Sequence, residues 1–461
     1  MHPDDLKSSR DSGPYWNVDI RNFGRVSRAS IEMAPLVVLL GRNNTGKSYV
    51  ASLLWSLLNF EELYLGRVSG PDIRPPDWYA RLMRDEEITV PEEVVVDNDS
   101  VAEWANGIIA SKVDDVVQRL LAVRTASVGS VTLSVKSNAP EVRITREPPE
   151  GGSSASMTAR LMVDAQGNRL FLNYQLISSP VSQMFLNRTF GWVYNSVMSG
   201  NFDDGSATYL PAARTGLMLA LRPLLSSALQ SLSFDDKRSS SRLPLTTVKF
   251  LQKLTEDAED ELDSDSGQIK SAEFLEASVL KGQILRDDDA ADPNFTYSVE
   301  GRDALPLHAA SSMVTELAPF LLFLRQGSLQ KGLVFEEPEA HLHLDAQRSM
   351  ARVIARLVND GIPVVITTHS DTFVQELNIL MQVKHSASRI VLQERYGYAD
   401  EELLDCAQIK AYEFVSSDSG TFTVEAKISE YGIVAESLNE TLEGIASEVI
   451  DVQSAGDQSD D

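Results

Sequence analysis

Residues 41–48 have the types and the spacing of a phosphate-binding loop. The segment runs Gly-Arg-Asn-Asn-Thr-Gly-Lys-Ser and matches the P-loop pattern G-x-x-x-x-G-K-[ST]. Its glycines let the backbone bend around phosphate groups, and the backbone N–H groups of the turn point at them. Lys47 would neutralise the β- and γ-phosphates, and Ser48 would ligate Mg²⁺. The residues expected to bind the nucleotide here are Gly41, Asn43, Asn44, Gly46, Lys47, Ser48 and Tyr49.

A pair of carboxylates follows a short apolar run at residues 333–335. This arrangement is that of a Walker B motif. Glu336 would sit beside Mg²⁺, and Glu337 would point at the γ-phosphate, where it can orient or deprotonate the attacking water. A charged loop after a strand is the structural alternative. The P-loop in the same chain favours the functional interpretation, because each site needs the other.

Two further groups could contact a γ-phosphate. His369 follows the apolar run 362–368, and its neutral imidazole could hydrogen-bond the γ-phosphate and the attacking water. Ser311 and Ser312 open an apolar helix that runs to Leu324, where their hydroxyls form either ordinary helix caps or an anion site. The predicted catalytic residues are Glu337, His369 and Lys47, and the predicted metal ligands are Ser48 and Glu336.

The elements around these residues are typical of an α/β protein. Residues 36–40 form an unbroken apolar run, which predicts a strand buried on both faces, and apolar residues at helical spacing follow the P-loop. Residues 15–20 and 29–33 alternate like strands around a turn at Gly24, and Trp16 or Phe23 could either stack on adenine or pack in the core. The further predicted helices are 102–123, 181–200, 212–230, 245–255, 371–382 and 433–452, the predicted strands of an antiparallel meander are 130–136, 141–146, 157–163 and 169–175, and two later strands are 408–415 and 421–427.

Composition limits the class of protein. The chain has 461 residues, of which 43% are apolar, so it can bury a sizeable core. No apolar run reaches the roughly 18 residues of a membrane helix, and the first residues lack a secretory signal, so we expect a cytoplasmic protein without a membrane partner. A single cysteine, Cys406, excludes an internal disulfide framework.

The formal net charge of −26 opposes long-range attraction to nucleic acid. Only a local basic patch could bind DNA, and the best window is 201–255. A solvated face and a nucleic-acid surface remain alternatives for this window. Its cations are Arg214, Arg222, Lys237, Arg238, Arg242, Lys249 and Lys253.

These motifs, in this order, resemble the ABC-type ATPases. More narrowly, they resemble the RecF/SMC-related and OLD-like AAA-family ATPases of DNA repair and prokaryotic anti-phage defence. Residues 336–343 read Glu-Glu-Pro-Glu-Ala-His-Leu-His, the form typical of that group, and residues 368–370 match its H-loop. Residues 209–216 resemble a segment of its helical lobe.

The resemblance implies an ABC-ATPase head with a mixed sheet, split by a large α+β insertion and helical lobe. It also implies that two heads dimerise head to tail around two ATP molecules, with Ser311 and Ser312 as the signature motif and residues 340–343 as the D-loop. Met313 departs from the family's glycine, and no glutamine can be assigned as a Q-loop. The expected divisions are 1–65, 66–300, 301–395, 396–453 and an acidic disordered tail at 454–461.

We therefore expect an ATPase that uses ATP and Mg²⁺ and controls a partner effector or DNA. No Asp-x-Asp pair follows His369, so we predict that this chain holds no Toprim nuclease domain and that a separately encoded nuclease or toxin could be the effector. The alternatives are a nucleotide-gated scaffold or sensor with slow hydrolysis, and the ATPase subunit of a membrane transporter. The insertion and the Glu-Glu-Pro-Glu form argue against the transporter.

Overall fold

The computed structural model describes residues 13–65, 75–82, 91–147, 158–165, 168–175, 180–199, 206–221, 224, 243–256, 265–287, 294–435 and 447–449. The predicted tail at 454–461 and residues 201–205, 222–223 and 225–242 of the basic window lie outside these ranges. None of the helices in the described part of the chain combines the length and the apolar character that a membrane crossing requires.

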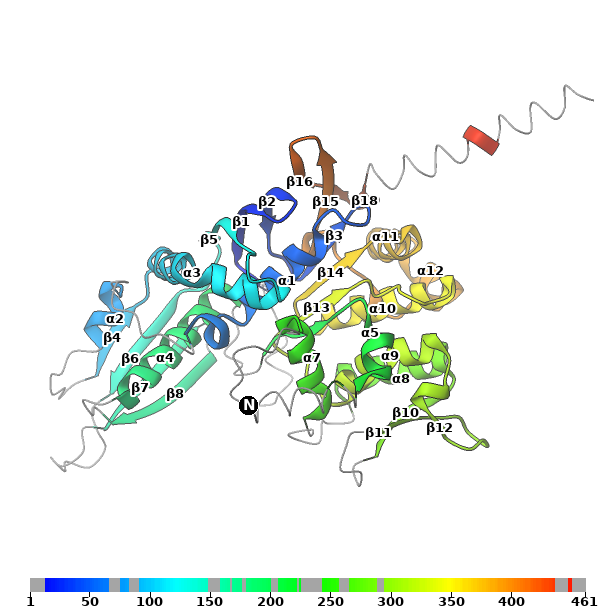
Figure 1. Cartoon of the computed structure of the whole chain (residues 1–461), viewed down its shortest axis with the longest axis horizontal. Coiled ribbons are helices and arrows are strands. Elements are labelled where there is room, and N and C mark those ends of the chain that lie inside the picture. The colour runs from blue at the N-terminus through cyan, green and yellow to red at the C-terminus, as the bar shows by residue number, and fades with distance from the viewer. Residues whose placement is uncertain are drawn as a thin grey trace, which may run out of the picture.

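A nine-stranded mixed sheet organises the molecule (Figure 1). Its order is β5-β1-β2-β16-β15-β3-β14-β13-β9, and the five strands from β15 to β9 run parallel. The antiparallel pairs β5–β1, β1–β2 and β15–β16 make the sheet mixed. The bounds are β1 Trp16–Phe23, β2 Val26–Glu32, β3 Leu36–Leu40, β5 Val128–Val135, β9 Thr208–Leu210, β13 Leu333–Glu336, β14 Val364–Thr368, β15 Ile409–Ser417 and β16 Gly420–Glu425.

Strand β3 shows why the centre of this sheet is apolar throughout. All five of its residues are buried, since side chains that alternate along a strand enter different cores on the two faces. Val37 and Leu39 join the core of α1 (Lys47–Leu58) and α3 (Asn98–Leu121). Leu36, Val38 and Leu40 join the core of α9 (Ser312–Arg325), α10 (Leu344–Asn359) and α11 (Asp371–His385).

The insertion after α1 forms a second sheet at one end of the molecule (Figure 1). Its order is β4-β6-β7-β8, and all of its pairs are antiparallel. Helices α3 and α4 contact each other beside it. The bounds in this region are η2 Glu61–Leu65, α2 Asp77–Leu82, β4 Glu92–Val95, β6 Val142–Glu147, β7 Thr158–Ala165, β8 Asn168–Gln175 and α4 Pro180–Ser199.

A helical lobe precedes the second half of the main sheet. Helix α8 packs against α9 and α10, and α5 packs against α9. A small antiparallel sheet, β10-β11-β12, lies at its edge. The bounds are α5 Arg214–Leu219, α7 Leu245–Thr255, α8 Gly267–Leu275, η3 Glu276–Leu280, β10 Gln283–Asp287, β11 Asn294–Ser298, β12 Leu305–Pro306 and η4 Leu307–Ala309, followed after α11 by α12 Arg389–Tyr396, η5 Asp400–Glu402, η6 Cys406–Gln408, β17 Lys427–Ser429 and β18 Gly432–Val434.

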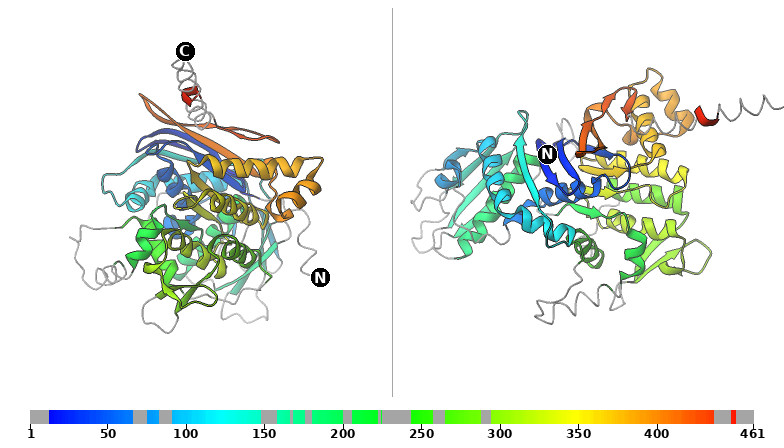
Figure 2. Two further views of the ribbon diagram at one scale, coloured as in Figure 1. Left: turned by 90° about the vertical axis from the view of Figure 1, so that its right-hand side faces the viewer. Right: turned by 45° about the horizontal axis from the view of Figure 1, so that its top comes forward.

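The structure corrects three expectations. Strand β5, predicted as part of the meander, pairs instead with β1 in the main sheet, because antiparallel runs do not encode which neighbour they choose. Strands β15 and β16 lie inside the main sheet and not in a separate extension; Figure 2 shows these orange strands beside the blue N-terminal ones. Residues 433–434, predicted to begin a helix, lie in β18 instead. The remainder of that predicted helix falls largely outside the described residues.

Candidate nucleotide-binding site

The P-loop lies between β3 and the first turn of α1, at the carboxyl end of the parallel strands. Gly41 and Gly46 have φ values of +136° and +99°, a backbone region that favours glycine. A Cβ on Gly46 would lie 2.5 Å from the Val26 side chain. Gly46 also caps α1 without a side-chain hydrogen bond. The first N–H groups of α1 are therefore left for an external anion.

Lys47 is the buried cation of this loop, with 6% of its surface exposed. Its Nζ donates to the carbonyl oxygens of Gly41 and Arg42, at 2.7 and 2.8 Å. Burial lowers the pKa of Lys47, while the negative charges of the nearby carboxylates raise it. The ammonium is thus held within the loop that it would share with a phosphate.

Glu336 ends β13 and joins three elements of the sheet. The Ser48 hydroxyl donates to its Oε2 at 2.5 Å, and the Tyr209 hydroxyl of β9 donates to its Oε1. Burial raises the pKa of Glu336, and these two hydrogen bonds act in the opposite direction. A serine hydroxyl beside a carboxylate is the oxygen donor set that Mg²⁺ prefers. The residues present therefore fit a magnesium ion, although the sequence did not reveal the role of Tyr209.

Glu337 is held by its backbone while its side chain stays partly open. Its φ is +43°, which is uncommon for a residue with a side chain and typical of functional loops. Its N–H donates to the Thr367 carbonyl at 2.9 Å, and its own carbonyl accepts from Arg214 at 3.0 Å. The Glu337 side chain is 31% exposed. The carboxylate is thus positioned by the chain and left free to act.

His369 follows β14 and lies between two carboxylates. Its Nδ1 is 3.4 Å from Glu339 Oε1 and 3.9 Å from Glu337 Oε1. The imidazole is 44% exposed, whereas the Glu339 side chain is only 5% exposed. Because β13 and β14 are parallel neighbours, their carboxyl ends bring these residues together.

Arg214 is a residue whose position sequence reasoning missed. It was counted in a basic window, as either a solvated face or a nucleic-acid surface, but it is 1% exposed. It donates to the carbonyl oxygens of Pro211, Glu336 and Glu337, and its ion pair with buried Glu316 spans 2.8 Å. Residues 209–210 end the edge strand β9 and residues 214–216 begin α5, so this segment links the helical lobe to the end of β13. The similarity of that segment to a known family was the one available signal.

The two serines occupy a different surface. Ser311 caps α9 by accepting a hydrogen bond from Val314 N–H at 3.4 Å, and the Ser312 carbonyl accepts from Thr215. Both serines are exposed. In the part of the chain that the structure describes, no hydrogen bond joins either of them to the P-loop, Glu336 or Glu337.

The aromatic residues near the P-loop divide by exposure. Trp16 and Phe23 are 1% and 0% exposed, so both pack in the core and neither can stack on adenine. Tyr49 is 40% exposed, and its ring lies 5.6 Å from that of Phe23. A Cβ on Gly24 would lie 2.6 Å from the Tyr49 ring. Tyr49 therefore presents an aromatic surface beside the loop.

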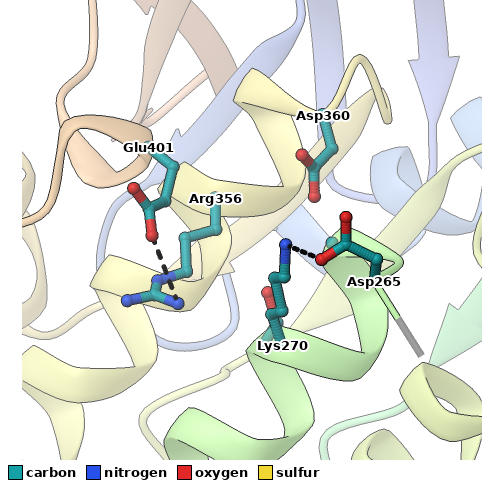
Figure 3. A pocket seen from close by; sticks show the side chains of 7 residues that line it. Asp265, Lys270, Arg356, Asp360 and Glu401 are labelled. Carbon is teal, nitrogen blue, oxygen red and sulfur yellow. Dashed lines mark ion pairs between the residues drawn. The ribbon is translucent and has the colours of Figure 1, made fainter.

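A pocket of about 300 Å³ lies elsewhere, among α8, α10 and η5 (Figure 3). Lys270 pairs with Asp265 at 2.6 Å, and Arg356 reaches Glu401 at 3.8 Å. Arg356 also pairs with buried Glu402. The lining of this pocket includes none of the predicted site residues, and the two cations in it, Lys270 and Arg356, are paired with carboxylates.

Comparison with known proteins locates an ATPase domain. Residues 220–374 match the family model described as AAA ATPase domain, a range that includes both serines, Glu336, Glu337 and His369. No curated protein matches the chain.

Distant structural similarities accompany that match. The crystal structure of the SmcHead bound to the C-winged helix domain of ScpA has a TM-score of 0.38 and 14% identity over 90% of this chain and 99% of that one. The Pyrococcus furiosus Smc head domain with an extended coiled coil, bound to the C-terminal domain of ScpA, has a TM-score of 0.33 and 12% identity over 94% of this chain and 100% of that one. The SMC head domain from Thermotoga maritima has a TM-score of 0.32 and 9% identity over 89% and 98%.

The predicted mixed α/β fold with a P-loop at the carboxyl end of its parallel strands is confirmed. A domain model of AAA ATPases matches about a third of the chain.

Proposed function

We propose that this chain binds ATP with Mg²⁺, hydrolyses the γ-phosphate, and uses that cycle to control a separately encoded effector or DNA. The observation that carries the proposal is the hydrogen bond of 2.5 Å between Ser48 and Glu336. It joins the loop after β3 to the end of β13, and Glu337 and His369 lie beside it. Ligands of open α/β sheets bind at this edge.

Each residue has one task in this mechanism. Lys47 neutralises the phosphates, and Ser48 and Glu336 would hold Mg²⁺, which when bound adds charge stabilisation. Glu337 orients the attacking water and accepts its proton. His369 hydrogen-bonds the attacking water beside the γ-phosphate. The work is mostly positioning and charge stabilisation, with little covalent chemistry.

We further propose that two copies pair head to tail around two ATP molecules. Support comes from the serines: Ser311 and Ser312 are exposed at the first turn of a 14-residue helix and are not joined to their own P-loop. Free N–H groups and hydroxyls at such a turn suit the γ-phosphate held by a second copy.

The first test replaces the proposed base. Glu337→Gln should lower ATP turnover by about 100-fold or more, while ATP still binds and light scattering reports a trapped dimer. Glu430→Gln, an exposed glutamate between β17 and β18, is the matched control and should behave as wild type. Undiminished phosphate release from Glu337→Gln would show that Glu337 is not the general base.

The second test is complementation between copies. Lys47→Ala and the double variant Ser311→Ala with Ser312→Ala should each be inactive alone. Mixing them should restore turnover, because a mixed dimer holds one complete site. Failure to recover activity on mixing would contradict the shared site.

A scaffold or sensor with slow hydrolysis remains the second candidate. Met313 favours it, since this half-buried side chain packs against the core at a position where the resembling family has glycine. Slow turnover together with full ATP-dependent dimerisation would identify the scaffold.

A role in anti-phage defence or DNA repair rests on the sequence resemblance alone. The described cations of the basic window are largely engaged: Arg214 is buried, Lys249 pairs with Glu62, and Lys253 donates to Thr208. These three cations therefore give no support to DNA as the partner. Turnover measured with and without double-stranded DNA separates the two.

A further inference from the structure

Glu339 is a buried carboxylate that the proposed mechanism does not use. It lies three residues beyond the end of β13 and is 5% exposed. Its Oε1 accepts hydrogen bonds from the Thr368 hydroxyl at 2.7 Å and from the His369 N–H at 3.0 Å. Its Oε2 is buried without a hydrogen-bond partner. A residue from the loop after β13 thus holds the loop after β14.

The burial of the Glu339 carboxylate requires an explanation, because moving a charged group out of water costs free energy. A neutral glutamine could accept both of these hydrogen bonds. The one ion-pair partner recorded for Glu339 in the described part of the chain is His369, whose Nδ1 lies 3.4 Å from the same Oε1. The charge therefore acts on the imidazole at close range, and it also favours the charged forms of Lys47 and Arg214.

Two carboxylates flank this ring and differ in their freedom. Glu339 is pinned by two hydrogen bonds, whereas Glu337 is 31% exposed and lies farther from Nδ1, at 3.9 Å. An imidazole nitrogen facing a carboxylate carries its proton there, which fixes the tautomer and the ring orientation. Nε2 is then an acceptor, to which the attacking water can donate one hydrogen bond while Glu337 accepts the other proton of that water.

We propose that Glu339 is the positioning residue that holds His369 with its proton on Nδ1, which leaves the Nε2 lone pair to accept a hydrogen bond from the attacking water. The inference rests on the proposed ATPase function for its kinetic consequence. Its structural part, the state of the His369 ring, does not depend on hydrolysis.

The kinetic test is a double-mutant cycle. Glu339→Gln should lower kcat by about tenfold or more and leave the KM for ATP within about twofold, as expected when an outer partner of a working histidine is lost. In a His369→Ala background, Glu339→Gln should have no further effect, because residues that act as a unit are not additive. An equal loss in both backgrounds, or none in either, would overturn the proposal.

Thr368→Val is the matched control, since it removes a hydrogen bond to the same oxygen and leaves the charge in place. It should lower kcat by less than Glu339→Gln does. An equal or larger loss would show that the loop contact matters, and not the charge. Thermal unfolding of each variant, compared with wild type, identifies any that fails to fold, and Glu339→Asp then replaces it, with an intermediate kcat expected.

A spectroscopic readout separates this proposal from the proposed function. The chain has six histidines, so ¹⁵N-labelled imidazole signals can be assigned by substitution. His369 should show a protonated Nδ1 in the wild type and lose that preference in Glu339→Gln. If turnover is absent but the tautomer shifts, the ATPase assignment fails and the contact stands. A protonated Nε2 with a bare Nδ1 in the wild type would overturn the contact itself.

Discussion

The fold holds two regions in different ways: the P-loop with the carboxyl end of β13, and the first turn of α9, which carries Ser311 and Ser312 and is called here the serine end. Glu336 and Lys47 are buried; Glu336 accepts from Ser48 and Tyr209, and Lys47 donates to two carbonyls of the P-loop. Ser311 and Ser312 are exposed, and their hydrogen bonds among the described residues join them to α9 and to Thr215 of α5. Buried charges must be satisfied within the fold, whereas an exposed cap can await a second molecule. The difference indicates which half of the site a single copy builds alone.

One buried ion pair connects the two regions. Arg214 contacts the carbonyls at the end of β13, and its partner Glu316 lies one turn beyond the serines on α9. Thr215 donates to both Glu316 and Ser312. The Arg214 guanidinium therefore connects the serine end of α9 to the carboxyl end of β13.

Removing the Arg214–Glu316 ion pair should have the largest effect on stability. Arg214→Met should lower the free energy of unfolding by about 3–5 kcal/mol, because it leaves Glu316 as a buried and uncompensated charge. Urea denaturation measures the loss. Replacing Arg214 and Glu316 together by apolar residues should recover part of it. A single variant within about 1 kcal/mol of wild type would show that the pair does not hold the two regions together.

Next in size is the effect of removing the buried ammonium. Lys47→Ala should weaken ATP binding by about 100-fold, which corresponds to about 2.7 kcal/mol. Fluorescent-nucleotide titration measures it, and Lys427→Ala, an exposed lysine on β17, is the matched control. Equal affinities for both variants would place the nucleotide elsewhere than this loop.

The serine end should show a small effect on stability and a larger one on turnover. Ser311→Ala with Ser312→Ala should cost about 1 kcal/mol of unfolding free energy, the value of a helix cap. Turnover should fall by more than that cost accounts for, if a second copy uses these hydroxyls. Thermal unfolding and phosphate release, measured on one sample, compare the two. Turnover that matches wild type would leave the serines as caps only.

The smallest expected effect concerns the exposed ring beside the P-loop. Tyr49→Ala should weaken ATP binding by about fivefold, close to 1 kcal/mol, if its ring packs on the nucleotide. Tyr431→Ala, which removes a distant ring that is 75% exposed, should leave affinity unchanged. Identical titrations for Tyr49→Ala and wild type would remove Tyr49 from the site.

The elements that local pattern specifies were the predictable ones. The apolar runs at β3, β13 and β14 and the residues that follow each could be read from the sequence, because strand period and motif spacing are local properties. Arg214 could not be read in this way, since its partner Glu316 is 102 positions further along the chain. The same limit explains β5, whose partner β1 depends on a pairing choice that alternation does not encode.

The neighbour of β3 bears on how the chain acquires its site during synthesis. The strand that leads into the P-loop pairs on one side with β15, and Leu36 lies opposite Ile409. Such a contact closes late, because translation delivers the N-terminal segment long before its partner. A nascent chain must keep the open edge of β3 from pairing with other strands until about residue 417 has left the ribosome. The sheet around the P-loop is then completed only after β15 has emerged.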